Sequence, residues 1–322
     1  MLVAILATSV CCGVSASASS TKDKKPQGTK SGFITTTDGV KIHYLEAGHQ
    51  KSFPSAEVGN PLPSGTPVTK GNISVTNPNQ FPSILFVPGW TMPAWIWEKQ
   101  LEFFAKDYRV VAMDPRSQGE SSQTHEGLYP AVRARDIKAV VDKLHLTPVV
   151  LVGWSMGVTE ICAYLDQFGS RDLAAIVLVD GYAGGTEPAE AMPTLGILKS
   201  TLEDRQNFLS KFMREIMFKK PQPGDYVARL QAASNVTPTD AAVALLVGMH
   251  STDYKPALLE NTKPVLICVA DSIFTKQMEY LHKQMPSARY EVFSDAGHTL
   301  FVDDADRFNA LLEDFLHDLM MR

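Results

Sequence analysis

The hydrophobic positions of the chain fall into continuous apolar runs that alternate with amphipathic segments from residue 83 onward. Runs of Val, Ile and Leu predict buried strands, and apolar residues three and four apart predict helices. Because strands that are apolar throughout are buried on both faces, the pattern predicts an α/β fold with a mostly parallel sheet flanked by helices. The expected strands are 83–89, 108–114, 148–154, 173–181, 263–270 and 288–294, and the expected helices are 94–107, 129–145, 156–169, the segment up to Pro286 and the C-terminal segment.

Three segments depart from this alternation. Residues 33–48 predict two short strands around Asp38 and Gly39, because Asp-Gly between alternating residues favours a hairpin. Residues 49–82, rich in proline and glycine, predict a long loop insertion. Residues 182–255 carry helix-like patterns where two parallel strands need a far shorter connection, so they predict an inserted helical cap.

The N-terminal segment predicts a secretory signal peptide and a secreted or periplasmic location. An apolar run from Leu2 to Val10 precedes the small-residue pattern of Ala16 and Ala18, and a polar stretch follows. An uncleaved anchor is the alternative, since no Lys or Arg precedes the apolar run. The predicted organisation is a signal peptide at 1–18, a first part of the core at 19–181, a cap at 182–255 and a second part of the core at 256–322.

The charge and cysteine content argue against several classes of function. The chain has 30 basic and 35 acidic residues, a net charge of −5 and no basic run, so we expect no nucleic-acid partner. No run beyond the leader approaches the roughly 20 apolar residues of a membrane span. Cys162 and Cys268 are expected to pack as small hydrophobic side chains, with a bridge between them as the alternative. No metal-ligand spacing occurs, so we expect no metal site.

One serine lies in a pattern that indicates nucleophilic chemistry. In the segment GWSMG, Ser155 lies between Gly153 and Gly157, where strand 148–154 is expected to turn into helix 156–169. The glycines allow the strand and the helix to approach each other, and the turn projects the serine hydroxyl at the helix N-terminus. Free N–H groups and the helix dipole favour negative charge there. Ser155 is therefore the candidate nucleophile.

With this motif the chain resembles the α/β-hydrolase superfamily over residues 32–322. The segments FVPGWTMPAWIW, DPRSQGES, GWSMG and DAGHTLFVDDADRFN are similar to segments of its capped esterase and non-haem haloperoxidase-like branch. The resemblance implies the α/β-hydrolase fold, which is a mostly parallel central sheet flanked by helices, with an inserted helical cap.

The resemblance also implies partners for the serine, because a serine nucleophile needs a base and the base needs an orienting acid. His298 follows the last predicted strand, where the family carries its catalytic histidine, and is the expected base. Asp271 follows the strand after which the family places the acid, so it is the expected acid. Asp180, which ends the preceding strand, is the alternative. The other histidines, His43 among them, are expected to be exposed or packing residues.

An oxyanion formed during acyl transfer needs two backbone N–H donors. The family places one at the residue after the nucleophile, here Met156, and one in the loop after strand 83–89, here Trp90. The Trp90 ring is expected to line the acyl pocket, with packing in the core as the alternative. Asp114 and Arg116 are expected to form an ion pair that supports the loop and takes no part in catalysis.

The predicted function is that of a serine carboxylesterase-like hydrolase, which uses Ser155, His298 and Asp271 through an acyl-enzyme and needs no cofactor. Cap segments rich in Leu, Phe and Met suggest small apolar acyl or aryl esters as substrates, and ordinary packing between helices is the alternative interpretation of these residues. Lactonase, carbon–carbon bond hydrolase and hydroxynitrile lyase chemistry use the same serine and are alternatives, as is perhydrolysis as a side activity. A non-catalytic ligand-binding relative is a further alternative.

Overall fold

The apolar runs form the strands of one sheet in the computed structural model, which describes residues 28–49, 81–185 and 188–321. The strands are β1 (Lys30–Thr35), β2 (Lys41–Ala47), β3 (Ser83–Val87), β4 (Val110–Met113), β5 (Val149–Trp154), β6 (Leu173–Val179), β7 (Val265–Ala270) and β8 (Arg289–Phe293). Within these ranges the sheet has eight strands in the order β1-β2-β4-β3-β5-β6-β7-β8. β2 runs antiparallel to both of its neighbours, and the strands from β4 to β8 pair in parallel. The predicted α/β fold is confirmed.

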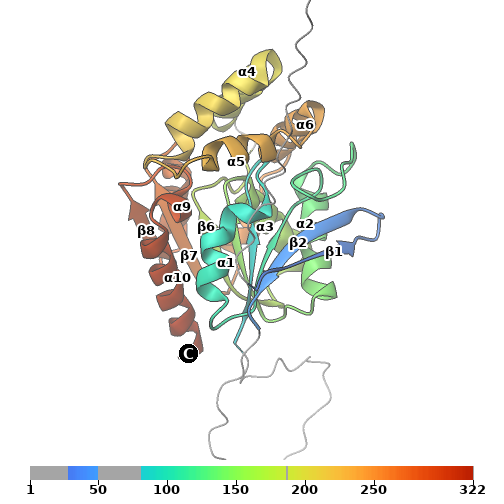
Figure 1. Cartoon of the computed structure of the whole chain (residues 1–322). Coiled ribbons are helices and arrows are strands. Elements are labelled where there is room, and N and C mark those ends of the chain that lie inside the picture. The colour runs from blue at the N-terminus through green and yellow to red at the C-terminus, as the bar shows by residue number, and fades with distance from the viewer. Residues whose placement is uncertain (1–27, 50–80, 186–187, 322) are drawn as a thin grey trace, which may run out of the picture.

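Helices cover both faces of this sheet (Figure 1). They are η1 (Ala94–Trp97), α1 (Glu98–Phe104), α2 (Pro130–Lys143), α3 (Met156–Phe168), α4 (Pro188–Phe212), η2 (Met213–Met217), α5 (Tyr226–Ser234), α6 (Thr239–Met249), α7 (Lys255–Leu259), α8 (Thr275–Gln284), α9 (Leu300–Asp303) and α10 (Ala305–Met320). Side chains of η1, α1, α9 and α10 pack on one face, and those of α2, α3, α7 and α8 pack on the other. In β5, Val150 and Val152 face the first layer, and Val149 and Leu151 face the second. The central strands are therefore almost entirely apolar.

The helices of the predicted cap segment lie over one end of the sheet, at the top of the view in Figure 1. We call α4, α5 and α6 the cap helices. Apolar side chains of α4 and α6 cluster with Met156, the first residue of α3, so these two helices lie above the end at which β5 turns into α3. α7 packs on the core instead, where Leu258 joins the cluster of α2 and α3. The cap helices thus cover the end of the sheet where the candidate nucleophile lies.

The predicted N-terminal hairpin is formed by β1 and β2, which pair with Ile34 opposite Ile42. Gly39 lies in the turn with a φ of +84°, a conformation that glycine adopts without strain. The predicted signal peptide at 1–18 lies outside the described residues, as does nearly all of the predicted insertion at 49–82. Both stay predictions.

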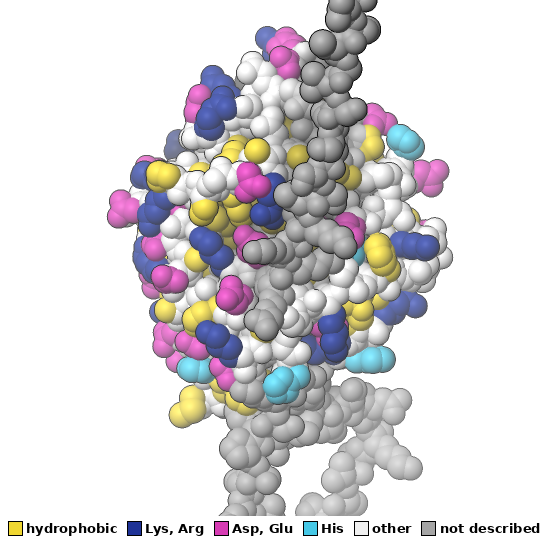
Figure 2. Space-filling model, in the orientation of Figure 1, with side chains coloured by type: hydrophobic (Ala, Val, Ile, Leu, Met, Phe, Trp, Pro, Cys, Tyr) yellow, Lys and Arg dark blue, Asp and Glu magenta, His cyan; other side chains and the backbone are white. Residues whose placement is uncertain are grey.

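Charged side chains of both signs are interspersed on the face drawn in Figure 2, so this face shows no extended patch of one sign over the part of the chain that is described. That distribution agrees with the small net charge and gives no indication of a nucleic-acid surface. Among the described helices, none is long and apolar enough to cross a membrane.

Candidate active site

Ser155 lies in the turn between β5 and α3, with a φ of 57° and a ψ of −119°. This backbone conformation is strained for a residue with a side chain. A Cβ at Gly153 would lie 2.6 Å from the Gly157 carbonyl oxygen, and a Cβ at Gly157 would lie 2.5 Å from the Val87 carbonyl oxygen. Both glycines are therefore needed for the strand and the helix to meet. The turn holds Ser155 at the N-terminus of α3, where backbone N–H groups have no partner within the helix.

The close approach at Gly157 gives a stability prediction. Gly157→Ala should lower the free energy of unfolding by about 3 kcal/mol, because its Cβ meets a main-chain atom that cannot move aside. Gly196→Ala is the matched control, since Gly196 lies in α4 with nothing within 4 Å of an added Cβ. That change should raise stability by roughly 0.5–1 kcal/mol. Urea denaturation measures both, and equal effects of the two substitutions would contradict the packing argument.

His298 lies beside this turn and is paired with Asp180. Its Nδ1 donates a hydrogen bond to Asp180 Oδ2 at 2.6 Å, and both side chains are buried. The Trp154 Nε1 donates to the His298 carbonyl at 2.8 Å, and the two rings lie 5.0 Å apart. Because Trp154 directly precedes Ser155, these contacts place His298 beside the strand end that leads to the candidate nucleophile. With Nδ1 bound to the carboxylate, Nε2 is the nitrogen left to accept a proton.

The structure does not place Asp271, the expected acid, beside His298, and Asp180, the alternative, holds that position instead. Asp271 is exposed beyond the end of β7, whereas Asp180 is fully buried beyond the end of β6. Asp180 Oδ1 accepts hydrogen bonds from the Ala270 N–H at 3.0 Å and from the Ser272 hydroxyl at 2.8 Å. The end of β7 therefore serves to hold the Asp180 carboxylate. The physical reason is strand order: β6 is the direct neighbour of β5, and β7 lies one strand further away.

The sequence does carry a signal that favours Asp180. Gly181 follows it, and a Cβ at Gly181 would lie 2.5 Å from the Ser155 carbonyl oxygen. An Asp-Gly pair directly after β6, the strand next to β5, is consistent with an acid that lies close to the turn of Ser155. Asp271 is followed by Ser272 and has no such glycine.

The loop after β3 brings Trp90 to the site. A Cβ at Gly89 would lie 2.8 Å from the Ser155 Cβ and 3.3 Å from its Oγ, so the Gly89–Trp90 peptide lies against the serine. Met156 begins α3 on the other side of Ser155. Trp90 and Met156 therefore both lie beside Ser155. Backbone N–H groups at these two positions could stabilise an oxyanion that forms next to the serine.

Two cap helices hold this loop. Trp90 Nε1 donates to the Ala242 carbonyl of α6 at 2.8 Å, and the Thr91 hydroxyl is hydrogen-bonded to the Ser234 hydroxyl of α5 at 2.7 Å. Thr91 is fully buried and has a φ of 58°. The conformation of the loop is thus set by contacts with the cap as well as by the core.

The walls of the site are aromatic and aliphatic. The ring of Phe274 stacks on His298 with centroids 5.1 Å apart, and the ring of Phe212 lies 6.4 Å from it. Phe208 lies 6.2 Å from the Trp90 ring. The surrounding apolar cluster joins Trp90 and Met156 to the cap residues Leu209, Ala241, Ala242, Leu245, Leu246 and Met249. An apolar group bound beside Ser155 would therefore contact the underside of the cap.

The predicted ion pair between Asp114 and Arg116 is wrong, because each has a different partner. Arg116 makes a bidentate contact with Asp136 of α2, at 2.6 and 2.7 Å. Asp114 instead accepts from His43 Nδ1 at 2.7 Å. Asp136 lies 20 residues beyond Arg116, and no local pattern indicates that α2 folds back over this loop.

His43 is buried in a second hydrogen-bonded series, Ser31–His43–Asp114. Its Nδ1 binds Asp114, and its Nε2 is hydrogen-bonded to the hydroxyl of the exposed Ser31 at 2.8 Å. As in His298, the Nδ1 of this histidine binds an aspartate, so the two histidine–aspartate pairs have the same arrangement. Asp114 also accepts from the N–H groups of Ala94 and Glu120. The series therefore ties the β1–β2 hairpin to two loops of the core.

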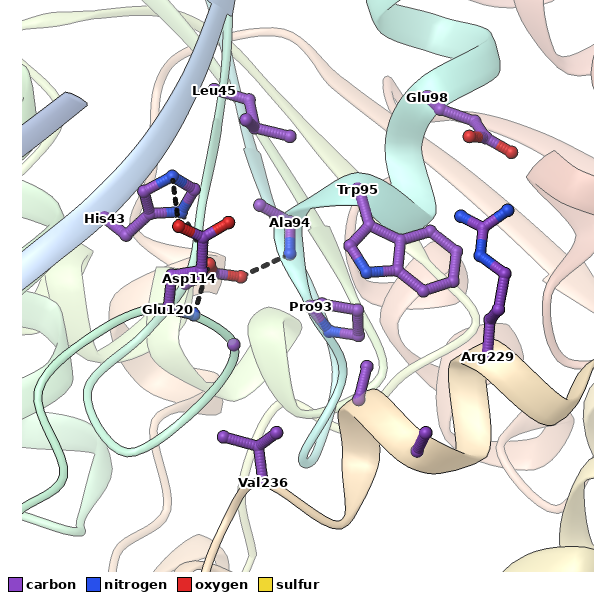
Figure 3. A pocket seen from close by; sticks show the side chains of 13 residues that line it. His43, Leu45, Pro93, Ala94, Trp95, Glu98, Asp114, Glu120, Arg229 and Val236 are labelled. Atoms are coloured by element: carbon purple, nitrogen blue, oxygen red, sulfur yellow. Dashed lines mark hydrogen bonds and ion pairs between the residues drawn. The ribbon is translucent and has the colours of Figure 1, made fainter. Parts of the chain in front are cut away.

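A cavity of about 350 Å³ lies next to this second series (Figure 3). Leu45, Pro93 and Trp95 form part of its apolar wall, and Arg229 of α5 lies over the Trp95 ring at 4.8 Å. Neither Ser155 nor His298 lines this cavity. It is thus separate from the candidate active site, although Pro93 belongs to the same loop as Trp90.

The cysteines of the described chain do not form a site. Cys162 and Cys268 are buried and unbridged, as expected for small hydrophobic side chains. Burial raises the pKa of both thiols, which keeps them protonated. No group of three or more metal-ligating side chains occurs among the residues that the structure describes.

The chain is similar in sequence and in fold to several known proteins. The chain is 28% identical over 250 residues to the bifunctional esterase/perhydrolase DCH of Acinetobacter calcoaceticus, over 73% of this chain and 80% of that protein. It is 26% identical over 301 residues to a non-heme haloperoxidase of Rhodococcus erythropolis, over 88% and 98% of the two chains. Its fold is similar to that of an esterase of Exiguobacterium antarcticum, with a TM-score of 0.71, 21% identity and coverage of 88% and 98%. A model of the alpha/beta hydrolase family matches residues 84–311, and the chain therefore belongs to this family.

Proposed function

We propose that this chain is a serine hydrolase that cleaves carboxylic esters through an acyl-enzyme. The observation that carries the proposal is the buried 2.6 Å contact between His298 and Asp180 beside the strained turn of Ser155. A base that is oriented by a carboxylate next to a serine is the arrangement that acyl transfer requires. The esterase among its relatives also supports this chemistry.

In the proposed mechanism the Ser155 Oγ attacks the ester carbonyl carbon while His298 Nε2 takes the hydroxyl proton. The carbonyl oxygen becomes an oxyanion, which the N–H groups of Trp90 and Met156 stabilise. The ester C–O bond then breaks, and His298 gives its proton to the departing alcohol. Water attacks the acyl-enzyme with His298 again as base, and the acid is released as Ser155 regains its proton. Asp180 stabilises the imidazolium and fixes the tautomer in both halves.

The proposed substrates are small esters with an apolar acyl or aryl group. Trp90, Phe208 and the apolar residues of α6 supply a surface that such a group can contact without burying unpaired polar atoms. Turnover of p-nitrophenyl acetate and butyrate, with labelling by a fluorophosphonate probe, tests the proposal. A folded chain that neither turns over these esters nor reacts with the probe would contradict it and favour a ligand-binding role.

Perhydrolysis is a second candidate, favoured by the esterase/perhydrolase to which the chain is similar. Hydrogen peroxide would replace water in the second half of the cycle, so that the acyl-enzyme yields a peracid and free Ser155. Peracid formation from an acetate ester and hydrogen peroxide, followed by halide oxidation, measures this activity.

The position of Phe208 gives a prediction on acyl length. Phe208→Ala should raise the kcat/KM ratio of hexanoate to acetate esters by about tenfold, because removing the ring opens space beside Trp90 for extra methylene groups. Phe168→Ala is the control, since that ring is partly exposed at the far end of α3. A ratio that stays the same in both variants would exclude Phe208 from the acyl pocket.

A further inference from the structure

Gln118 is a fully buried glutamine in the loop after β4, and its amide binds the loop that carries Trp90. Its Nε2 donates to the carbonyl oxygen of Gly89 at 3.0 Å and to that of Met92 at 2.8 Å. Both N–H bonds of the amide are thus used on main-chain carbonyls of one loop. No step of the proposed acyl transfer makes direct use of this side chain.

The bond to Gly89, together with the Met92 N–H that donates to the same carbonyl oxygen at 3.2 Å, fixes the direction of the Trp90 N–H. The Gly89 carbonyl and the Trp90 N–H belong to one peptide unit, which is planar and trans, so the two groups point in opposite directions. Gln118 holds the carbonyl on one side of the loop, and the N–H therefore points to the opposite side. The same peptide lies against Ser155, as the 2.8 Å approach at Gly89 shows.

The orientation of the Gln118 amide is itself fixed by Arg133 of α2. Arg133 Nη2 donates to Gln118 Oε1 at 2.8 Å. Because a guanidinium has no acceptor, the amide oxygen must face Arg133 and the amide nitrogen must face the loop. Arg133 Nε in turn donates to Glu160 Oε1 at 2.6 Å, and both side chains are 1% exposed. Burial raises the pKa of Glu160 to about 7, and Arg133 opposes that rise.

This network reaches both candidate oxyanion donors. Glu160 lies in α3, one turn beyond Met156, and Gln118 holds the peptide of Trp90. One buried path therefore links the loop that supplies the first N–H to the helix that supplies the second. Such a link fixes the relative position of two donors that must bind the same oxygen.

We propose that Gln118 is a positioning residue that aims the Trp90 N–H at the oxyanion, with Arg133 and Glu160 holding Gln118 in its orientation. The inference rests on the proposed function, since it presumes an oxyanion beside Ser155. Gln118 does not touch the substrate and acts only through the Gly89–Trp90 peptide.

The test compares Gln118→Met with Gln100→Met in the full chain. Gln100 is a matched control because it is equally buried and its Nε2 donates to the Phe301 carbonyl at 2.9 Å, away from the loop. Both variants should unfold at a lower temperature than the wild-type chain. Only Gln118→Met should lose about ten- to hundredfold in kcat on p-nitrophenyl butyrate, with KM within about threefold, since a misplaced donor weakens transition-state binding selectively.

A second readout is the affinity for an alkyl trifluoromethyl ketone, which binds a serine nucleophile as a tetrahedral oxyanion. Its Ki should rise in Gln118→Met by about the same factor as kcat/KM falls. If Gln118→Met does not fold, Gln118→Glu replaces it, because a carboxylate keeps the contact with Arg133 and has no N–H for Gly89. The expected losses are the same.

An unchanged kcat in a folded Gln118 variant would overturn the inference, as would an equal loss of kcat in Gln100→Met. A loss confined to KM would also overturn it. These outcomes are distinct from a failure of the proposed function, which the wild-type chain would reveal by turning over no ester at all.

Discussion

Ser155→Ala should lower kcat for p-nitrophenyl esters by about 10⁴- to 10⁶-fold and abolish fluorophosphonate labelling. The proposed mechanism has no other atom that can form the acyl-enzyme, so the oxyanion donors alone would remain. The fold should survive, because Ala keeps the Cβ that the turn already accommodates. Ser155→Gly should be equally inactive and should be more stable by about 1 kcal/mol or more, since glycine relieves the strain of a φ of 57°.

Ser31→Ala is the matched control for this prediction, because Ser31 heads the series Ser31–His43–Asp114 with hydrogen bonds in the same order. Turnover and labelling should stay within about threefold of the wild type, since Ser31 lies within strand β1 and not at the turn from a strand into a helix. Labelling that persists in Ser155→Ala and disappears in Ser31→Ala would move the nucleophile to the N-terminal hairpin.

Asp180→Asn should lower kcat by about 10²- to 10⁴-fold, whereas Asp271→Asn should change it by less than about threefold. In the Asp180→Asn variant the new amide would keep an oxygen for Ala270 and Ser272 and would turn its NH₂ group toward His298. That donor favours the tautomer with the proton on Nε2, which cannot accept the serine proton. The loss of the carboxylate also removes the charge that stabilises the imidazolium.

The comparison needs kcat measured on folded protein, because Asp180 is fully buried and its replacement also costs stability. Circular dichroism and thermal unfolding of each variant establish the folded fraction. A large loss of kcat in Asp271→Asn, with full activity in Asp180→Asn, would show that the acid is Asp271 at the end of β7.

The sequence predicted the fold well because the central strands are buried on two faces and therefore consist almost entirely of apolar residues. Strand 173–181, for example, is β6 (Leu173–Val179) with only small errors at its ends. Helix 94–107 is less well predicted, since the structure divides it into η1 and α1 and ends it at Phe104. The two glycines around Ser155 predicted its position at the strand–helix turn, and the structure shows the close contacts of both glycines.

The acid was harder to choose, because the single Gly181 after Asp180 is a weaker signal than the two glycines around Ser155. Asp180 and Asp271 both follow apolar strands, and the local pattern does not tell which strand lies beside β5. The partners of Arg116 and the role of Gln118 depend on how α2 and the loops fold over one another. Such contacts join residues distant in sequence, and periodicity carries no information about them. His43 was expected to be exposed or to pack, and its packing against Asp114 and Ser31 agrees with the second of these.

The hydrogen bonds from Trp90 to Ala242 and from Thr91 to Ser234 mean that the cap is not an interchangeable module. If the proposed function holds, exchanging the cap for that of a relative should alter acyl selectivity, and it would also change the partners of the loop beside Ser155. A chimera that keeps a main-chain carbonyl at the place of Ala242 and a hydroxyl at the place of Ser234 would preserve those partners. When the cap is exchanged to obtain a new selectivity, the residues at which the new cap contacts the core matter as much as the residues that face the substrate.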